Sequence, residues 1–169
     1  MILRQADFSD FEFIKTAILN AQLYLKGLGI DQWQDGYPDV NVLIEDLSNK
    51  ESFVVENEFE QVMGYVALSE ELEDTYENID GQWITNSNKY GVIHRMAVIN
   101  EYRGRGVARF IFRTYEEILR LKKIKSIRID THPENFGMQK LVSLFNYQYC
   151  GIIYVRNNSK RLAYEKIIS

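Results

Sequence analysis

The stretch VIHRMAVINEYRGRGVARFIFRTYEEIL, residues 92–119, passes from an apolar run through a turn of glycine and arginine into a second patterned run. The first run is typical of a buried strand, and the second carries apolar residues at helical spacing from Val107 onward. Gly104 and Gly106 tolerate backbone angles that other residues rarely adopt, so a tight turn fits between the two runs. The stretch therefore predicts a strand, a turn and an amphipathic helix in direct succession.

The start of this helix is a candidate anion site. The first backbone N–H groups of a helix lack intrahelical acceptors, and the helix dipole adds partial positive charge at that end. A pyrophosphate can use both, while Arg103, Arg105 and Arg109 can pair with its oxygens. A glycine turn that serves only steric needs remains the alternative. A dinucleotide or triphosphate site is not expected, because neither GxGxxG nor GxxxxGK followed by Ser or Thr occurs.

The segments on either side of this stretch predict one α/β domain over residues 1–169. The expected strands lie at residues 2–4, 52–56, 61–68, 91–99, 126–130, 147–155 and 162–167. The expected helices begin after Ser9 or Asp10, after Asp39, near Arg105 or Gly106, and near Pro133 or Asn135. The polar residues 69–89 read as one long loop, and no repeat or linker indicates a second domain.

Composition narrows the class of protein. A net charge of −4 and a pI near 5.3 argue against nucleic-acid binding as the main role. The chain has a single cysteine, Cys150, and two histidines, His94 and His132, too few for a structural zinc site or a disulfide framework. No apolar run approaches the ~20 residues of a membrane span. We therefore expect a cytoplasmic protein without a metal and without membrane association.

Two segments together resemble the Gcn5-related N-acetyltransferase (GNAT) family. Its signature, Arg or Gln, two residues, Gly, one residue, then Gly or Ala, is met by residues 103–108, RGRGVA. Residues 127–153 are similar to a second family segment, with Asn135 at the position that contacts the cofactor arm. With the N-terminal strand and two helices, the resemblance covers nearly the full chain. It implies the acyl-CoA N-acyltransferase fold, with a central mixed, mostly antiparallel sheet flanked by helices.

The resemblance also implies acetyl-CoA as cosubstrate and assigns residues to it. The backbone of Met96 and Val98 would pair with the pantetheine arm like an added strand. The pyrophosphate would lie on the turn formed by Arg103, Gly104, Arg105, Gly106, Val107, Ala108 and Arg109. The implied reaction is transfer of acetyl to a primary amine, small-molecule or peptide, by direct attack in a ternary complex. A homodimer is possible.

One departure from the family pattern concerns the residue that protonates the thiolate leaving group. Many members carry a tyrosine in the second segment that protonates the departing thiolate, and here that position is Val142. A noncatalytic sensor or interaction module that binds coenzyme A is therefore the alternative function. The last two strands carry other phenols, Tyr147, Tyr149, Tyr154 and Tyr164. The simpler interpretation is that they are ordinary aromatic residues of the sheet.

His94 is the candidate general base. The alternation of strand residues puts it on one face with Met96 and Val98, and related acetyltransferases carry a glutamate or histidine base at this position. An imidazole also changes protonation near neutral pH. A hydrogen-bonded histidine in a half-buried strand is an equal alternative.

The remaining candidates lie outside the glycine and arginine turn. Trp33 and Tyr37 lie in the connection between the first two helices, which in the family borders the acceptor pocket, or they close the core. His132 reads as a turn-stabilising residue and Cys150 as a packed strand cysteine, since direct transfer needs no nucleophile on the protein.

Overall fold

The computed structural model describes residues 1–168. Its strands are β1 (Ile2–Gln5), β2 (Ser52–Glu56), β3 (Val62–Ser69), β4 (Asp80–Gly81), β5 (Gly91–Val98), β6 (Ser126–Thr131), β7 (Gln148–Val155) and β8 (Ser159–Ile167). Its longer helices are α1 (Phe11–Gly27), α2 (Val40–Ser48), α3 (Val107–Leu121) and α4 (Phe136–Leu144). The strand, turn and helix expected within residues 92–119 are therefore confirmed as β5 and α3.

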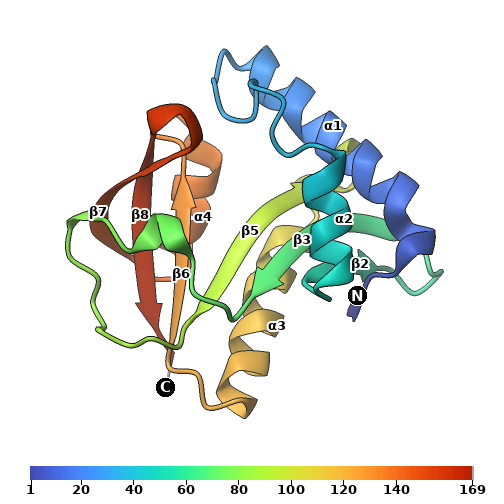
Figure 1. The fold of residues 1–169 in the computed structure, drawn as a ribbon. Coiled ribbons are helices and arrows are strands. Elements are labelled where there is room, and N and C mark those ends of the chain that lie inside the picture. Colours follow the sequence, from blue (N-terminus) through green and yellow to red (C-terminus); the bar gives the residue numbers. More distant parts are fainter. Residues whose placement is uncertain (169) are drawn as a thin grey trace. The chain divides into compact units, whose positions relative to one another are not determined.

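Backbone hydrogen bonds join the strands in the order β1-β2-β3-β5-β6-β8-β7-β4 (Figure 1). The pairs β1–β2, β2–β3, β6–β8, β7–β8 and β4–β7 are antiparallel. Strands β5 and β6 run parallel, with Gly91 opposite Ile127, and α3 is the connection between them. The expected mixed, mostly antiparallel sheet flanked by helices is confirmed.

Contacts group the described residues into two units. The first unit comprises Met1–Leu68 and His94–Tyr115, and the second comprises Ser69–Ile93 together with the chain from Glu116 onward. Strand β5 and helix α3 each contribute residues to both units. Each unit is described below by itself, and the single domain expected over residues 1–169 stays a proposal.

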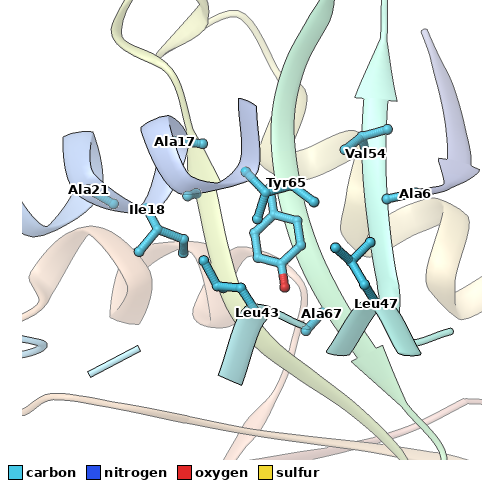
Figure 2. Packing of buried hydrophobic residues seen from close by; sticks show 11 residues of the cluster. Ala6, Ala17, Ile18, Ala21, Leu43, Leu47, Val54, Tyr65 and Ala67 are labelled. Carbon is cyan, nitrogen blue, oxygen red and sulfur yellow. The ribbon is translucent and has the colours of Figure 1, made fainter. Parts of the chain in front are cut away.

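In the first unit, α1 and α2 pack on the strands through apolar stripes. The stripe of α1 includes Ile14, Ala17, Ile18, Ala21 and Leu25, and that of α2 includes Leu43 and Leu47. Figure 2 shows the ring of Tyr65 among side chains of both stripes, with its hydroxyl oxygen pointing toward Leu43 and Leu47. Burying each such leucine or isoleucine stabilises the fold by about 1.5–3 kcal/mol.

The helix starts differ in one detail from the expectation. Asp39 caps α2 as expected, because its carboxylate accepts from the N–H groups of Asn41 and Val42. Asp10 precedes α1 but its side chain makes no cap hydrogen bond there. Its carboxylate instead accepts from the N–H of Asp7, which completes a capping box for the 3₁₀ turn Phe8–Asp10, and from Arg4, six residues earlier in the chain.

Gly64 brings α3 close to the first-unit strands. A Cβ at Gly64 would lie 3.1 Å from Val107 Cγ1 and 3.1 Å from the Ala97 carbonyl oxygen. Tyr65, the next residue of β3, points to the α1 and α2 side, so Gly64 belongs to the opposite face. The first turn of α3 is therefore seated on that face by the absence of a side chain.

In the second unit, the expected loop over residues 69–89 is more ordered than its polar composition indicated. It contains β4, which pairs with β7, and it contributes Tyr76 and Trp83 to a buried cluster with Tyr90, Val92, Cys150, Ile153 and Ala163. The Glu165 carboxylate accepts from the N–H groups of Ile84 and Thr85 at 2.7 and 3.1 Å. Packing of aromatic residues and hydrogen bonds to one buried carboxylate thus order this segment, whose polar composition had predicted an irregular loop.

Candidate functional site

The candidate anion site is the turn before α3. Gly104 and Gly106 adopt φ of 75° and 89°, the left-handed region that glycine permits. A Cβ built on either glycine would meet no atom within 4 Å, so the space above both is open. The first bond of the helix runs from the Phe110 N–H to the Gly106 carbonyl at 2.9 Å. The N–H groups of residues 106–109 precede that bond and have no intrahelical acceptor.

The arginines around the turn differ in how firmly they are held. Arg103 is half-buried, and its Nε donates to the Val98 carbonyl oxygen at 3.2 Å. Arg105 and Arg109 are exposed, and the guanidinium of Arg105 lies 5.7 Å from the ring centroid of Tyr102. One positive group is therefore fixed beside the end of β5, and two extend into solvent.

Strand β5 is irregular in its middle. Arg95 has a φ of 48°, which is uncommon for a residue with a side chain and lies outside the extended region of a strand. His94 and Met96 flank it, both half-buried, and Val98 ends the strand, its side chain facing Gly64. Regular alternation does not run through Arg95, so the face of His94 cannot be read from that of Met96 by a period of two.

A buried polar network lies beside this irregularity. The Asp46 carboxylate accepts from Nε and Nη2 of Arg95, both at 2.7 Å, and from the Tyr65 hydroxyl at 2.9 Å. Nη1 of Arg95 donates to the Tyr37 hydroxyl oxygen at 2.7 Å. Although burial opposes it, the oxygens of Tyr37 and Asp46 raise the pKa of Arg95 above its ordinary value. Burial and the Asp46 charge likewise raise the pKa of Tyr65.

Sequence reasoning missed Asp46 and Arg95. The available signal was the position of Asp46 in α2, three residues after Leu43 and one before Leu47, on the apolar stripe of the helix. A carboxylate at such a position is rarely left unpaired. The identity of its partner was not readable, since Arg95 lies 49 positions further along the chain.

Trp33 and Tyr37 both belong to the first unit but have different surroundings. Trp33 is half-buried and packs against the first-unit core cluster, which fits the core-packing alternative. Tyr37 is tied down at three points. Its hydroxyl accepts from Arg95, its carbonyl from Gln22 Nε2 at 3.1 Å, and its N–H donates to Asp35. Tyr37 is therefore the better-ordered polar group of this connection.

The candidates from the second segment belong to the second unit. Asn135 caps α4, its side-chain oxygen accepting from the Met138 N–H at 3.1 Å. Val142 is 1% exposed in the same helix and has no proton to donate. Nδ1 of His132 accepts from the Glu134 N–H at 3.2 Å, a contact that fits the turn-stabilising interpretation.

The other candidate groups show no constellation for covalent or metal chemistry. Cys150 is a buried free thiol on β7, and burial raises its pKa, which disfavours the thiolate that a nucleophile requires. Tyr149 and Tyr154 are exposed, whereas Tyr147 is buried. Within residues 1–168, no three His, Cys, Asp or Glu side chains gather as metal ligands. None of the helices in that range combines the length and apolar character of a bilayer span.

Comparison with known proteins identifies relatives. Residues 17–147 match the model of the Acetyltransferase (GNAT) family. A GNAT acetyltransferase from Streptococcus agalactiae 2603 shares 32% identity and a TM-score of 0.89, over 99% of this chain and 95% of that chain. A GNAT acetyltransferase from Listeria monocytogenes 4b F2365 shares 20% identity and a TM-score of 0.76, over 98% and 94% of the two chains.

A more distant fold relative has a known ligand. The NatC complex bound to Gag peptide and CoA has 16% identity and a TM-score of 0.70, over 99% of this chain and 98% of that chain. At this identity the likeness concerns the fold alone. Among curated proteins, no sequence matches this chain.

Proposed function

This chain belongs to the GNAT acetyltransferase family, acetyl-CoA-dependent N-acetyltransferases, and from that premise we propose that it acetylates a primary amine by direct attack in a ternary complex. Acetyl-CoA supplies an activated acetyl group as a thioester, which becomes an amide on the acceptor as the thiol leaves. The observation that carries the proposal is the turn before α3, with two positive-φ glycines under open space.

The residues of the turn fit a pyrophosphate. In the proposed arrangement, backbone N–H groups of Gly104, Gly106, Val107 and Ala108 donate to phosphate oxygens, and the positive end of α3 adds to the attraction. Arg103, Arg105 and Arg109 supply charge-assisted hydrogen bonds. The backbone of Met96 and Val98 would hold the pantetheine arm in extended form.

The acceptor side of the proposal rests on His94, Trp33 and Tyr37. His94 would accept the proton that the amine loses, directly or through a water molecule, because only a neutral amine can attack. Trp33 and Tyr37 would border the amine, which is a small molecule or a peptide N-terminus. A peptide is a reasonable candidate because a protein of this fold, the NatC complex, binds one.

This scheme has no assigned residue that protonates the departing thiolate. Val142 stands where many family members carry a tyrosine, so a water molecule or the protonated base would have to serve instead. The same valine keeps a noncatalytic coenzyme A-binding module as the second candidate function. A cytoplasmic location and a homodimer are also proposals.

A thiol-release assay with acetyl-CoA and a panel of amines tests the proposal. The panel should contain small diamines, amino acids, aminoglycosides and peptides with different N-terminal residues. We expect amine-dependent release of thiol together with acetylated product by mass spectrometry. Tight binding of acetyl-CoA without turnover on any amine would instead favour the noncatalytic module.

A further inference from the structure

Asp46 is a buried carboxylate to which the proposed function gives no role. It is 3% exposed, and its two oxygens accept the three hydrogen bonds from Arg95 and Tyr65 described above. A charge buried to this depth needs such pairing, and removing one partner of a buried ion pair is strongly destabilising to what remains. The carboxylate therefore governs where the Arg95 guanidinium lies.

Arg95 connects that carboxylate to two parts of the proposed site. Its backbone, at φ 48°, sits between His94 and Met96 in β5. Residues with side chains persist in the left-handed region only where their surroundings hold them. Two of its guanidinium nitrogens bind Asp46, and the third, Nη1, donates to the Tyr37 hydroxyl. The Asp46–Arg95 ion pair is thus linked both to the β5 backbone and to the side chain of Tyr37.

We propose that Asp46 is a positioning residue for acetyl transfer. Through Arg95 it holds two groups in the positions that the acceptor site requires: the β5 backbone next to His94, and the Tyr37 hydroxyl. The inference rests on the proposed function, because it gives His94 and Tyr37 their roles in handling the acceptor. All four side chains belong to the first unit, so the argument needs no contact with the second. The turn before α3 follows this segment of β5 in the chain, so the pair should affect the turnover of the amine more than it affects coenzyme A binding.

The first unit contains a matched control for this pair. Arg4 binds Asp10 through two hydrogen bonds of 2.7 and 2.8 Å, in the same two-pronged geometry. Asp10 is 6% exposed, close to the value for Asp46. Its other partners are the N–H of Asp7 and, through Arg4, the Glu56 carboxylate, and none of these belongs to the proposed site. Loss of this pair should change stability without changing catalysis.

Asp46→Asn and Asp10→Asn should be compared in steady-state kinetics with both substrates and in calorimetry with coenzyme A. For Asp46→Asn we expect kcat/KM for the amine to fall about 10- to 100-fold, as misplacement by about 1 Å can cause. The Kd for coenzyme A should rise by a clearly smaller factor, since the phosphate turn is untouched and only the pantetheine contact at Met96 lies next to Arg95. Asp10→Asn should keep the kinetic constants of the wild type.

Wild-type kinetics in folded Asp46→Asn would overturn the inference, and so would an equal loss of coenzyme A affinity and amine turnover, which indicates general loosening. If Asp46→Asn does not fold, Tyr37→Phe and a comparison of Arg95→Gly with Arg95→Ala take its place. Glycine accepts a positive φ without strain, so Arg95→Gly should retain more activity than Arg95→Ala, and Tyr37→Phe should raise the amine KM.

The absence of both of these effects would overturn the inference as well. No turnover by wild-type protein on any amine would refute the proposed function and this inference with it. Turnover by the wild type that Asp46→Asn leaves unchanged would refute this inference alone.

Discussion

The guanidinium carbon of Arg103 lies 3.8 Å from the ring centroid of Tyr24, while Nε of the same arginine donates to the Val98 carbonyl oxygen. The ring of an α1 residue and the last residue of β5 therefore hold this side chain at the start of the turn. A cation that is already ordered loses less conformational entropy when it binds a phosphate than one that moves freely in solvent.

The first prediction follows from this difference among the arginines. Arg103→Ala should weaken coenzyme A binding about tenfold, because a charge-assisted hydrogen bond from an ordered donor is lost. Arg105→Ala removes an exposed charge and should cost only about two- to threefold. Isothermal titration calorimetry measures both, with Arg113→Ala, an exposed arginine further along α3, as the control. Equal losses for Arg103→Ala and Arg113→Ala would contradict the prediction.

The second prediction concerns Gly106, where a Cβ would occupy the open space over the turn. Gly106→Ala should weaken coenzyme A binding about tenfold or more by obstructing close approach of the pyrophosphate. The substitution also strains the backbone by about 1–2 kcal/mol because φ is positive. Gly29→Ala is the matched control, since Gly29 has a φ of 73° and equally open surroundings at the end of α1. Similar affinities in the two folded variants would argue against the turn as the phosphate site.

The sequence was most informative where local residue chemistry determines local geometry. Gly104 and Gly106 predicted a tight turn, and both adopt the positive φ that such a turn requires. The apolar spacing from Val107 onward predicted α3, and that helix runs over Val107–Leu121. These features depend on a few neighbouring residues, so a single sequence contains the necessary information.

Long-range pairs were the part that the sequence could not supply. The order of residues 69–89 depends on β4 pairing with β7 and on Glu165, about eighty positions away, accepting from Ile84 and Thr85. Arg95 leaves the extended region at a point where alternation had predicted a regular strand, and its ion pair with Asp46 spans two distant segments. No periodicity within either segment encodes such a partner.

The third prediction tests the pairing of Glu165. This carboxylate is fully buried, and it also accepts from Thr85 Oγ1 at 2.6 Å and from Arg128 Nε at 3.2 Å. Glu165→Gln leaves the buried Arg128 without its counter-charge and should lower the free energy of unfolding by about 3 kcal/mol. Urea unfolding measures the loss, and amide hydrogen exchange should quicken at Ile84 and Thr85. A loss below about 1 kcal/mol, the scale of an exposed pair, would contradict this role.

The fourth prediction concerns pH and Asp10. The hydrogen bonds from Arg4 outweigh burial and hold the pKa of this carboxyl below its ordinary value. In the folded protein Asp10 thus binds a proton less readily than in the unfolded chain. Its stabilisation is complete above the unfolded pKa of about 3.9, and it is lost as pH falls through the lower folded value.

Asp10→Asn should therefore be less stable than the wild type by about 1–3 kcal/mol at neutral pH, and the gap should close below about pH 4. Urea unfolding at pH 7, 5, 4 and 3 follows the gap. A difference between the two proteins that stays constant down to pH 3 would show that the carboxylate charge is not what stabilises the fold.

The last prediction is that His94 accepts the proton that the attacking amine loses. A positioned general base contributes typically ~10²–10⁴ in rate, so His94→Ala should lower kcat within that range while coenzyme A affinity stays nearly unchanged. Because only a neutral imidazole accepts a proton, the acidic limb of kcat/KM in the wild type should move or disappear in the variant. Amines of different pKa separate this limb from ionisation of the acceptor itself. His94→Gln serves as a second variant that keeps a polar group in the half-buried position but cannot act as a base. A folded His94→Ala protein with wild-type kcat and an unchanged acidic limb would leave water or a second amine to take the proton.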